Sequence, residues 1–179
     1  LDRLGQERAK GKGKRKVERR KKPMKIVQAD GLLLEEILDG SYPIWGEGLD
    51  RAAFGRWNRA QLDTPWGRVH LGRVALVDGH GLLASAKRYD LVVSLRGERR
   101  PALGIGAVFT PPDRRGRGHA SRLIEMMIAA AEGSATIAML FSEIGPAFYE
   151  RLGFHVVPQE MTSLDVVVRP GAPAALVRA

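Results

Sequence analysis

The chain contains no cysteine among its 179 residues. It therefore cannot form a disulfide scaffold, a thiolate zinc site or a site with a thiol nucleophile. No apolar run reaches the roughly 18 residues that a membrane-spanning helix requires, and the four histidines lack metal-ligand spacing. Hydrophobic residues make up 44% of the chain, enough for one core. These features predict a cytoplasmic protein with one domain and without metal or membrane contact.

Most of the net charge of +9 lies in residues 1–23, which hold 11 Lys/Arg and 3 Asp/Glu. This stretch has no apolar period and is broken by Gly and Pro, so we expect a disordered tail. It could act as a nucleic-acid-binding arm through phosphate contacts. However, it has no aromatic residue for base stacking. We favour a solvated tail, or sequence that lies upstream of the true gene, because Met24 directly precedes a strand-like segment.

The body of the chain alternates strand and helix patterns. The expected strands are 25–29, 69–77, 82–94, 102–110, 136–141, 154–157 and 163–168. The expected helices are 32–38, 49–62, 118–132 and 145–152, with the first one ending at Asp39 and Gly40. This order predicts one mixed α/β domain over residues 24–168, followed by a flexible tail, 169–179.

A glycine-rich segment joins strand 102–110 to helix 118–132. Pro111 and Pro112 end the strand, and Arg-Gly-Arg-Gly at 115–118 leads into the helix. Small residues at a helix N-terminus, with arginines nearby, favour a phosphate-bearing ligand. The Gly-Lys-Ser/Thr of a P-loop is absent, as is the third glycine of a dinucleotide fingerprint. An ordinary helix start with exposed arginines remains the alternative.

Two segments resemble motifs of the GNAT acyltransferase superfamily. Residues 108–120 (VFTPPDRRGRGHA) resemble motif A, and residues 147–154 (AFYERLGF) resemble motif B. The resemblance covers about residues 25–168. It implies the GNAT fold: a mixed, mostly antiparallel sheet with splayed central parallel strands and helices on both faces. Residues 108–120 and residues 140–154 (LFSEIGPAFYERLGF), with Trp57 and Trp66, also show a weaker similarity to fungal lysine acetyltransferase-like members.

The resemblance implies that acetyl-CoA lies where strands 102–110 and 136–141 splay apart. The backbone of Val108, Phe109 and Thr110 would bond the pantetheine arm, and an amide near Phe109 would polarise the thioester carbonyl. Ser142 stands where the family often has an asparagine on the pantetheine side. The pyrophosphate would be held by the amides of a six-residue turn: Arg115, Gly116, Arg117, Gly118, His119 and Ala120.

Tyr149 matches the position that protonates the leaving thiolate in many GNAT enzymes. The general base is less clear, because Gly104 and Gly106 occupy the stretch where some members carry a glutamate. Glu143 is the nearest carboxylate to nominate, and His119 is a poor base inside a phosphate turn. A water relay or an amine that arrives neutral would need no dedicated base.

The sequence thus predicts an N-acetyltransferase that transfers the acetyl group of acetyl-CoA directly to a primary amine. The acceptor, a small-molecule or peptide amine, would enter over residues 32–62, near Trp45, Trp57 and Trp66. Two alternatives stay open: a nucleic-acid-associated protein that acts through its basic tail, and a GNAT member that binds acyl-CoA without turnover.

Overall fold

The computed structural model describes residues 23–142 and 144–158. The chain divides into two units, residues 1–143 and residues 144–179. The strands that the structure describes all belong to the first unit, and the second unit begins after the last of them.

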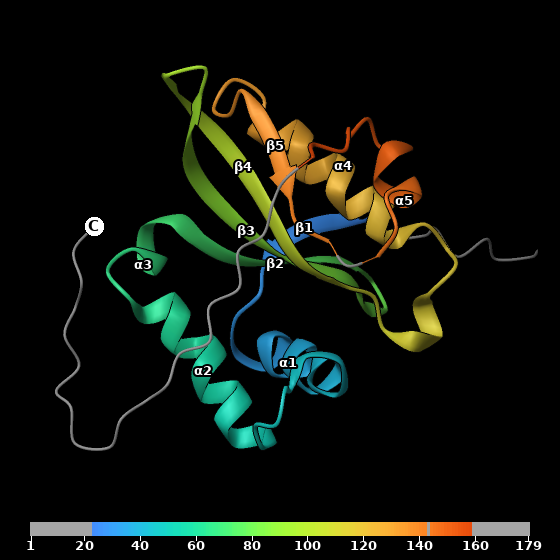
Figure 1. The fold of residues 1–179 in the computed structure, drawn as a ribbon. Coiled ribbons are helices and arrows are strands. Elements are labelled where there is room, and N and C mark those ends of the chain that lie inside the picture. The colour runs from blue at the N-terminus through green and yellow to red at the C-terminus, as the bar shows by residue number, and fades with distance from the viewer. Residues whose placement is uncertain (1–22, 143, 159–179) are drawn as a thin grey trace, which may run out of the picture. The chain divides into compact units, whose positions relative to one another are not determined.

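The first unit is built on a five-stranded sheet with the order β1-β2-β3-β4-β5 (Figure 1). Neighbouring strands are antiparallel from β1 to β4, and β4 and β5 run parallel. The mostly antiparallel sheet with one parallel pair confirms the predicted architecture. The strands are β1 (Lys25–Gln28), β2 (Leu71–Asp78), β3 (Gly81–Leu95), β4 (Glu98–Phe109) and β5 (Ile137–Leu140).

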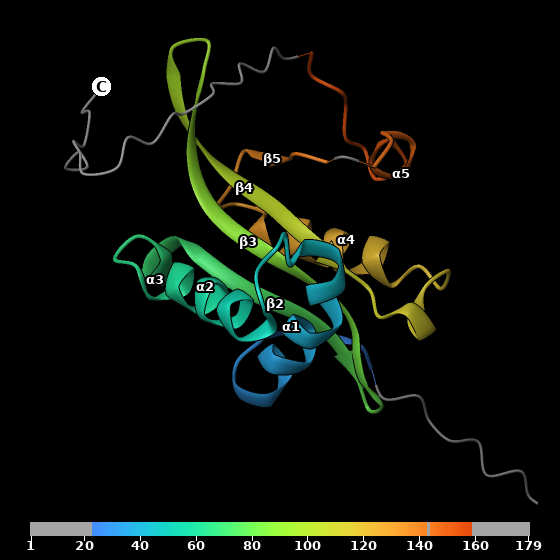
Figure 2. The same ribbon diagram turned by 60° about the horizontal axis from the view of Figure 1, so that its bottom comes forward.

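Helices cover both faces of this sheet (Figure 2). Helices α1 (Gly31–Trp45) and α2 (Arg51–Asp63) lie on one face, and α4 (His119–Ala131) lies on the other. The core on the α1 face includes Ile37, Ala75 and Phe109. On the other face α4 packs against β2, β3 and β4. Its buried residues are those that the helical period predicted: Leu123, Ile124, Met127 and Ala131.

Helix α1 is longer than the sequence predicts. Residues Asp39 and Gly40 were expected to end it, yet the helix continues to Trp45. Gly40 has a packing role instead, because a Cβ atom there would lie 2.7 Å from the Phe109 ring. The missing side chain lets α1 approach the end of β4 closely. Gly40, expected from the sequence to be a helix end, is therefore a point of close contact between α1 and the sheet.

The start of β2 also differs from the prediction. Residues 69–77 were expected to be one strand, but Val69 and His70 belong to the short helix α3 (Gly67–His70). The amides of both residues donate to the Trp66 carbonyl, at 3.1 and 2.9 Å. The Thr64 hydroxyl accepts from the Gly67 amide at 2.8 Å. This local cap outweighs the alternating apolar pattern of residues 69–77. A helix of only four residues is too short to show a helical period in the sequence.

The second unit begins with one helical turn, α5 (Ala147–Glu150). Helix α5 is shorter than the expected 145–152, and Gly153 follows it with a φ of +85°. The predicted strand at 154–157 is wrong, because these residues form no ladder within the described chain. An apolar run forms a strand only where a partner accepts its hydrogen bonds. The other strand expected near the C-terminus, 163–168, lies outside the described residues.

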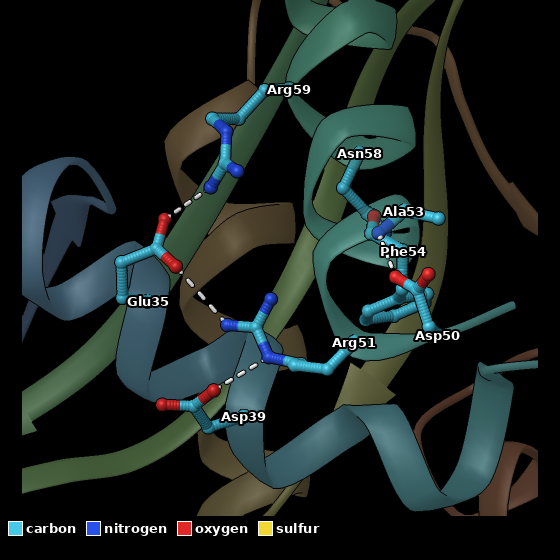
Figure 3. A network of polar contacts seen from close by, with 8 residues as sticks. All are labelled: Glu35, Asp39, Asp50, Arg51, Ala53, Phe54, Asn58 and Arg59. Atoms are coloured by element: carbon cyan, nitrogen blue, oxygen red, sulfur yellow. Dashed lines mark hydrogen bonds and ion pairs between the residues drawn. The ribbon is translucent and has the colours of Figure 1, made fainter.

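A polar network joins α1 to α2 (Figure 3). Arg51 pairs with Asp39 at 2.6 Å and with Glu35 at 3.1 Å. Glu35 also pairs with Arg59. These pairs are partly solvated, so each contributes little to stability. Their main consequence is electrostatic, since both carboxylates that α1 presents to α2 are already neutralised.

The contact at Gly40 predicts an unusual response to a small substitution. We expect Gly40→Ala to lower the free energy of unfolding by about 1–3 kcal/mol, because a methyl group would overpack the Phe109 ring. Alanine would otherwise favour the helix by about 1 kcal/mol. Urea unfolding followed by circular dichroism measures the change.

Gly55→Ala in α2 is the matched control. A Cβ atom at Gly55 would meet only the ends of the Arg51 and Arg59 side chains, which can move aside. This variant should be as stable as the parent protein or more stable. If Gly40→Ala were equally well tolerated, the packing role of Gly40 would be wrong.

Candidate functional site

Strand β4 loses one of its two neighbours along its length. Strand β5 pairs with it from Ala102 to Ile105 and no further within the described residues. From Gly106 to Phe109, β4 therefore has a paired strand only on its β3 side. The free edge carries backbone N–H and C=O groups that an extended ligand could bond in the manner of an added strand. This is the stretch where the sequence placed Val108 and Phe109.

A β-bulge marks the same stretch of β4. Ser85 pairs with Phe109 and Lys87 with Gly106, so Ala107 and Val108 both lie opposite one residue of β3. Ala107 has a φ of +46°, which few residues with a side chain adopt. The bulge turns the backbone out of the regular ladder. The Phe109 side chain, in contrast, is buried in the core, so only its backbone faces a ligand role.

The glycine-rich turn has the geometry of an anion site. Gly116 and Gly118 have φ values of +72° and +75°, and Gly118 is the N-cap of α4. No side chain caps this helix, and its first turn holds no acidic residue. The Nε atom of Arg115 donates to the Thr110 carbonyl at 3.2 Å. No described carboxylate pairs with Arg115 or Arg117, so the turn keeps its positive charge.

The residues predicted for this turn form one continuous surface. Residues 115–118 are exposed, and His119 and Ala120 are partly buried. A Cβ atom at either Gly116 or Gly118 would meet nothing within 4 Å, so the space over the turn is open. Ser142 is exposed just after β5, and Glu143 lies outside the described residues.

Tyr149 lies in the second unit, in helix α5. Its buried ring meets Phe148 edge-on at 4.9 Å between ring centroids, and Phe154 edge-on at 6.1 Å. These two contacts fix the ring and leave the hydroxyl without a described hydrogen-bond partner. Phe148 and Phe154 thus act as packing partners of the Tyr149 ring. The role of Tyr149 as an acid stays a prediction.

The structure also brings together a group that sequence reasoning missed. Arg73 of β2 pairs in register with Lys87 of β3, and Leu71 pairs with Tyr89. We call Arg73, Lys87 and Tyr89 the basic floor, because they share the sheet face beneath α2. The Lys87 ammonium donates to Gln61 Oε1 at 2.7 Å and lies 5.2 Å from the centre of the Trp57 ring.

Burial shapes the electrostatics of the basic floor. Desolvation lowers the pKa of Arg73 to about 10, so the guanidinium remains charged at neutral pH. Desolvation and then the nearby Arg73 charge lower the pKa of Lys87 to about 8. Desolvation raises the pKa of Tyr89, against the opposing effect of Arg73. Two positive charges therefore share a poorly solvated surface.

The described part of the chain holds no group of three or more His, Asp or Glu residues that could bind a metal ion. None of the helices in residues 23–142 and 144–158 is long and apolar enough to cross a bilayer.

The fold is shared with solved acetyltransferases. A possible acetyltransferase from Clostridium difficile 630 superposes with a TM-score of 0.64 at 16% identity, over 80% of this chain and 98% of that one. The aminoglycoside N-acetyltransferase AAC(6')-Iy, solved with CoA, has a TM-score of 0.62 at 17% identity, over 83% and 98%. The enzyme AAC(6')-IG from Acinetobacter haemolyticus gives 0.62 at 17%, over 80% and 99%. The shared fold is that of an acyltransferase.

A comparison with protein-family models identifies the family of this chain. The model of the GNAT acetyltransferase domain matches residues 49–157, more than half of the chain. The chain therefore belongs to the GNAT acetyltransferase family, as its two motifs predicted. No curated protein matches its sequence.

The lowered pKa of Lys87 predicts a pH-dependent cost in stability. Because the folded state disfavours the charged ammonium, the unfolded chain binds more protons between about pH 8 and pH 10.5. Stability should rise with pH across this window. We expect Lys87→Met to raise the melting temperature at pH 7, and this gain should shrink as the pH rises from 8 toward 10.5.

Thermal unfolding of the variant and the parent across this pH range measures the difference. Lys25→Met is the control, because Lys25 is also a strand lysine but is exposed. It supplies the reference for a strand lysine that is not buried. A constant or growing difference for Lys87→Met would show that burial imposes no such cost on Lys87.

Proposed function

We propose that this protein is an N-acetyltransferase that uses acetyl-CoA as co-substrate and a primary amine as acceptor. The observation that carries the proposal is the bulged end of β4, which is paired with β3 on one edge only and is followed by the glycine-rich turn at the start of α4. An extended pantetheine arm and a pyrophosphate are joined in CoA in that same order. Membership of the GNAT family and the CoA complex of AAC(6')-Iy support this assignment.

The chain's own residues would hold the co-substrate in two ways. The free backbone groups of Val108, Phe109 and Thr110 would bond the pantetheine amides. The amides from Arg115 to Ala120 would receive the pyrophosphate, with the dipole of α4 adding to the attraction. Among them, the Arg115 amide also donates to the Pro112 carbonyl at 3.4 Å. Ser142 would meet the pantetheine arm from the β5 side.

The reaction would proceed by direct attack. The amine nitrogen bonds to the thioester carbonyl carbon, and an amide near Phe109 stabilises the oxyanion that forms. The C–S bond then breaks, and the thiolate takes its proton from Tyr149. The nitrogen of the tetrahedral intermediate releases its extra proton to water, since no residue of the described site is a clear base, and Tyr149 regains a proton from water. The products are the N-acetylated amine and CoA.

The acceptor belongs to the small-molecule or peptide amines. AAC(6')-Iy and AAC(6')-IG add aminoglycosides to the amines worth testing. A screen would measure release of free thiol with amino acids, peptides, polyamines and the aminoglycoside kanamycin. A protein that binds acetyl-CoA but acetylates none of them would favour a binding role without turnover.

Gly118→Glu should abolish co-substrate binding. It places a carboxylate where the pyrophosphate would lie, and we expect the affinity for acetyl-CoA to fall by at least about 100-fold. Calorimetry with acetyl-CoA measures this directly. Unchanged affinity in a folded variant would contradict the placement of the pyrophosphate.

Gly133→Glu is the matched control, because it adds the same charge at the opposite end of the same helix. Gly133 also has a positive φ, +81°, and open space around it. The two variants therefore share their backbone strain. Only Gly118→Glu should lose acetyl-CoA.

Tyr149→Phe tests the proposed acid. The substitution keeps the ring contacts with Phe148 and Phe154, so the melting temperature should not change. We expect kcat to fall by about 100-fold, within the usual range for loss of a general acid, while the Kd of acetyl-CoA stays the same. Steady-state kinetics and calorimetry separate the two effects. Full activity would remove Tyr149 from the mechanism.

A further inference from the structure

The basic floor carries a charge that the described protein does not neutralise. Arg73 is only 4% exposed, and its Nε atom has no hydrogen-bond partner. Its one side-chain hydrogen bond, to Ser85 Oγ, is long at 3.5 Å. A buried guanidinium normally requires an anion and several acceptors. Arg73 has neither among the residues that the structure describes.

The two carboxylates that α1 presents to α2 already have cationic partners. Glu35 and Asp39 pair with Arg51 and Arg59, as Figure 3 shows. Lys87 has only the neutral Gln61 amide and the Trp57 ring as partners. In residues 23–142 no carboxylate lies within ion-pair distance of Arg73 or Lys87. The missing anion must therefore come from outside this set.

The floor also lies beside the place where acetyl transfer would occur. Lys87 is the register partner of Gly106, the residue directly before the bulge at Ala107. The Tyr89 ring lies over Gly106, since a Cβ atom there would be 3.1 Å from it. Because the pKa of Tyr89 is raised, its hydroxyl stays protonated and can donate a hydrogen bond.

We infer that the acceptor amine of this enzyme carries a carboxylate, which the basic floor binds beside the bulge of β4. The partly exposed Lys87 ammonium makes the direct contact, and the buried Arg73 guanidinium adds its field from behind. The substrate class is that of amino acids and peptides with a free carboxylate, rather than polycationic amines. This inference rests on the proposed acetyltransferase function and specifies its acceptor.

The positive field of the basic floor also acts on the acceptor amine, which is the nucleophile. A positive environment lowers the pKa of a nearby amine, because it disfavours the ammonium form. A carboxylate-bearing amine would thus be attracted through its carboxylate, and its ammonium group would lose a proton more easily. Such a site needs no dedicated carboxylate base, in keeping with Gly104 and Gly106 at the family's glutamate stretch.

The test compares each free amino acid or dipeptide with its C-terminal amide, and adds spermidine and kanamycin as polycations. Calorimetry with acetyl-CoA comes first, so that failure of the proposed function is detected separately. Thiol release then gives kcat/KM for each pair. The amine of the amide is less basic and more often neutral, so intrinsic reactivity favours the amide. We expect the acids to be preferred nonetheless, by at least about 10-fold for the best pair.

Variants then assign the preference to the floor. Arg73→Met and Lys87→Met should each raise KM for the acids by about 10-fold or more, with little effect on the amides and an unchanged Kd for acetyl-CoA. Arg73→Met should also melt at a higher temperature, because it removes a buried unpaired charge. Arg88→Met is the matched control, since the neighbouring Arg88 is exposed and paired with Asp90 at 2.8 Å.

Three results would overturn the inference: faster turnover of the amides, faster turnover of the polycations, or turnover of no acid by a protein that binds acetyl-CoA. A preference for acids that persists in both Arg73→Met and Lys87→Met would assign it to other residues and would also overturn the role of the floor. A protein that does not bind acetyl-CoA would overturn the proposed function instead.

Discussion

The change in hydrogen bonding along β4 is the constraint on which the rest of the site depends. From Ala102 to Ile105 the strand is paired on both edges, and from Gly106 it is paired on one edge only within the described residues. A backbone with free donors and acceptors must satisfy them with solvent or with a ligand. The bulge at Ala107 lies in this free stretch, and the turn that caps α4 begins within ten residues of it. Strand β4 thus supplies a free edge for an extended ligand, and it leads directly to the glycine-rich turn that could bind an anion.

The sequence predicts the local structure of this stretch well because its signals are local. Two prolines end a strand, two glycines take positive φ values, and a helix begins directly after them. Each feature depends on residues next to one another in the chain, so no knowledge of the packing is required. The same holds for the core face of α4, which follows from the helical period alone. The turns after β2 and β3 are local in the same way.

The basic floor and the length of α1 depend on contacts between distant residues, so the sequence gives no signal for them. Arg73 and Lys87 stand in different strands, and each looks like an ordinary polar residue of an alternating pattern. Only the β2–β3 register makes them neighbours, and the Gln61 and Trp57 side chains of α2 cover Lys87. Gly40 is similar, because its meaning depends on a ring 69 positions further along the chain. At Gly40, packing against the Phe109 ring outweighs the local sequence signal for a helix end.

A buried cation that lacks a partner lowers stability, and a small domain has little stability to spare. Arg73 could be replaced by an apolar residue of similar length without loss of packing, so packing does not account for its charge. Its position does, because a positive field beside the bulge would stabilise both a bound carboxylate and the oxyanion of the tetrahedral intermediate. The field would act most strongly where water is excluded, which is the condition that α2 creates over Lys87. On this argument, the feature that weakens the fold is the one that we propose defines the acceptor site.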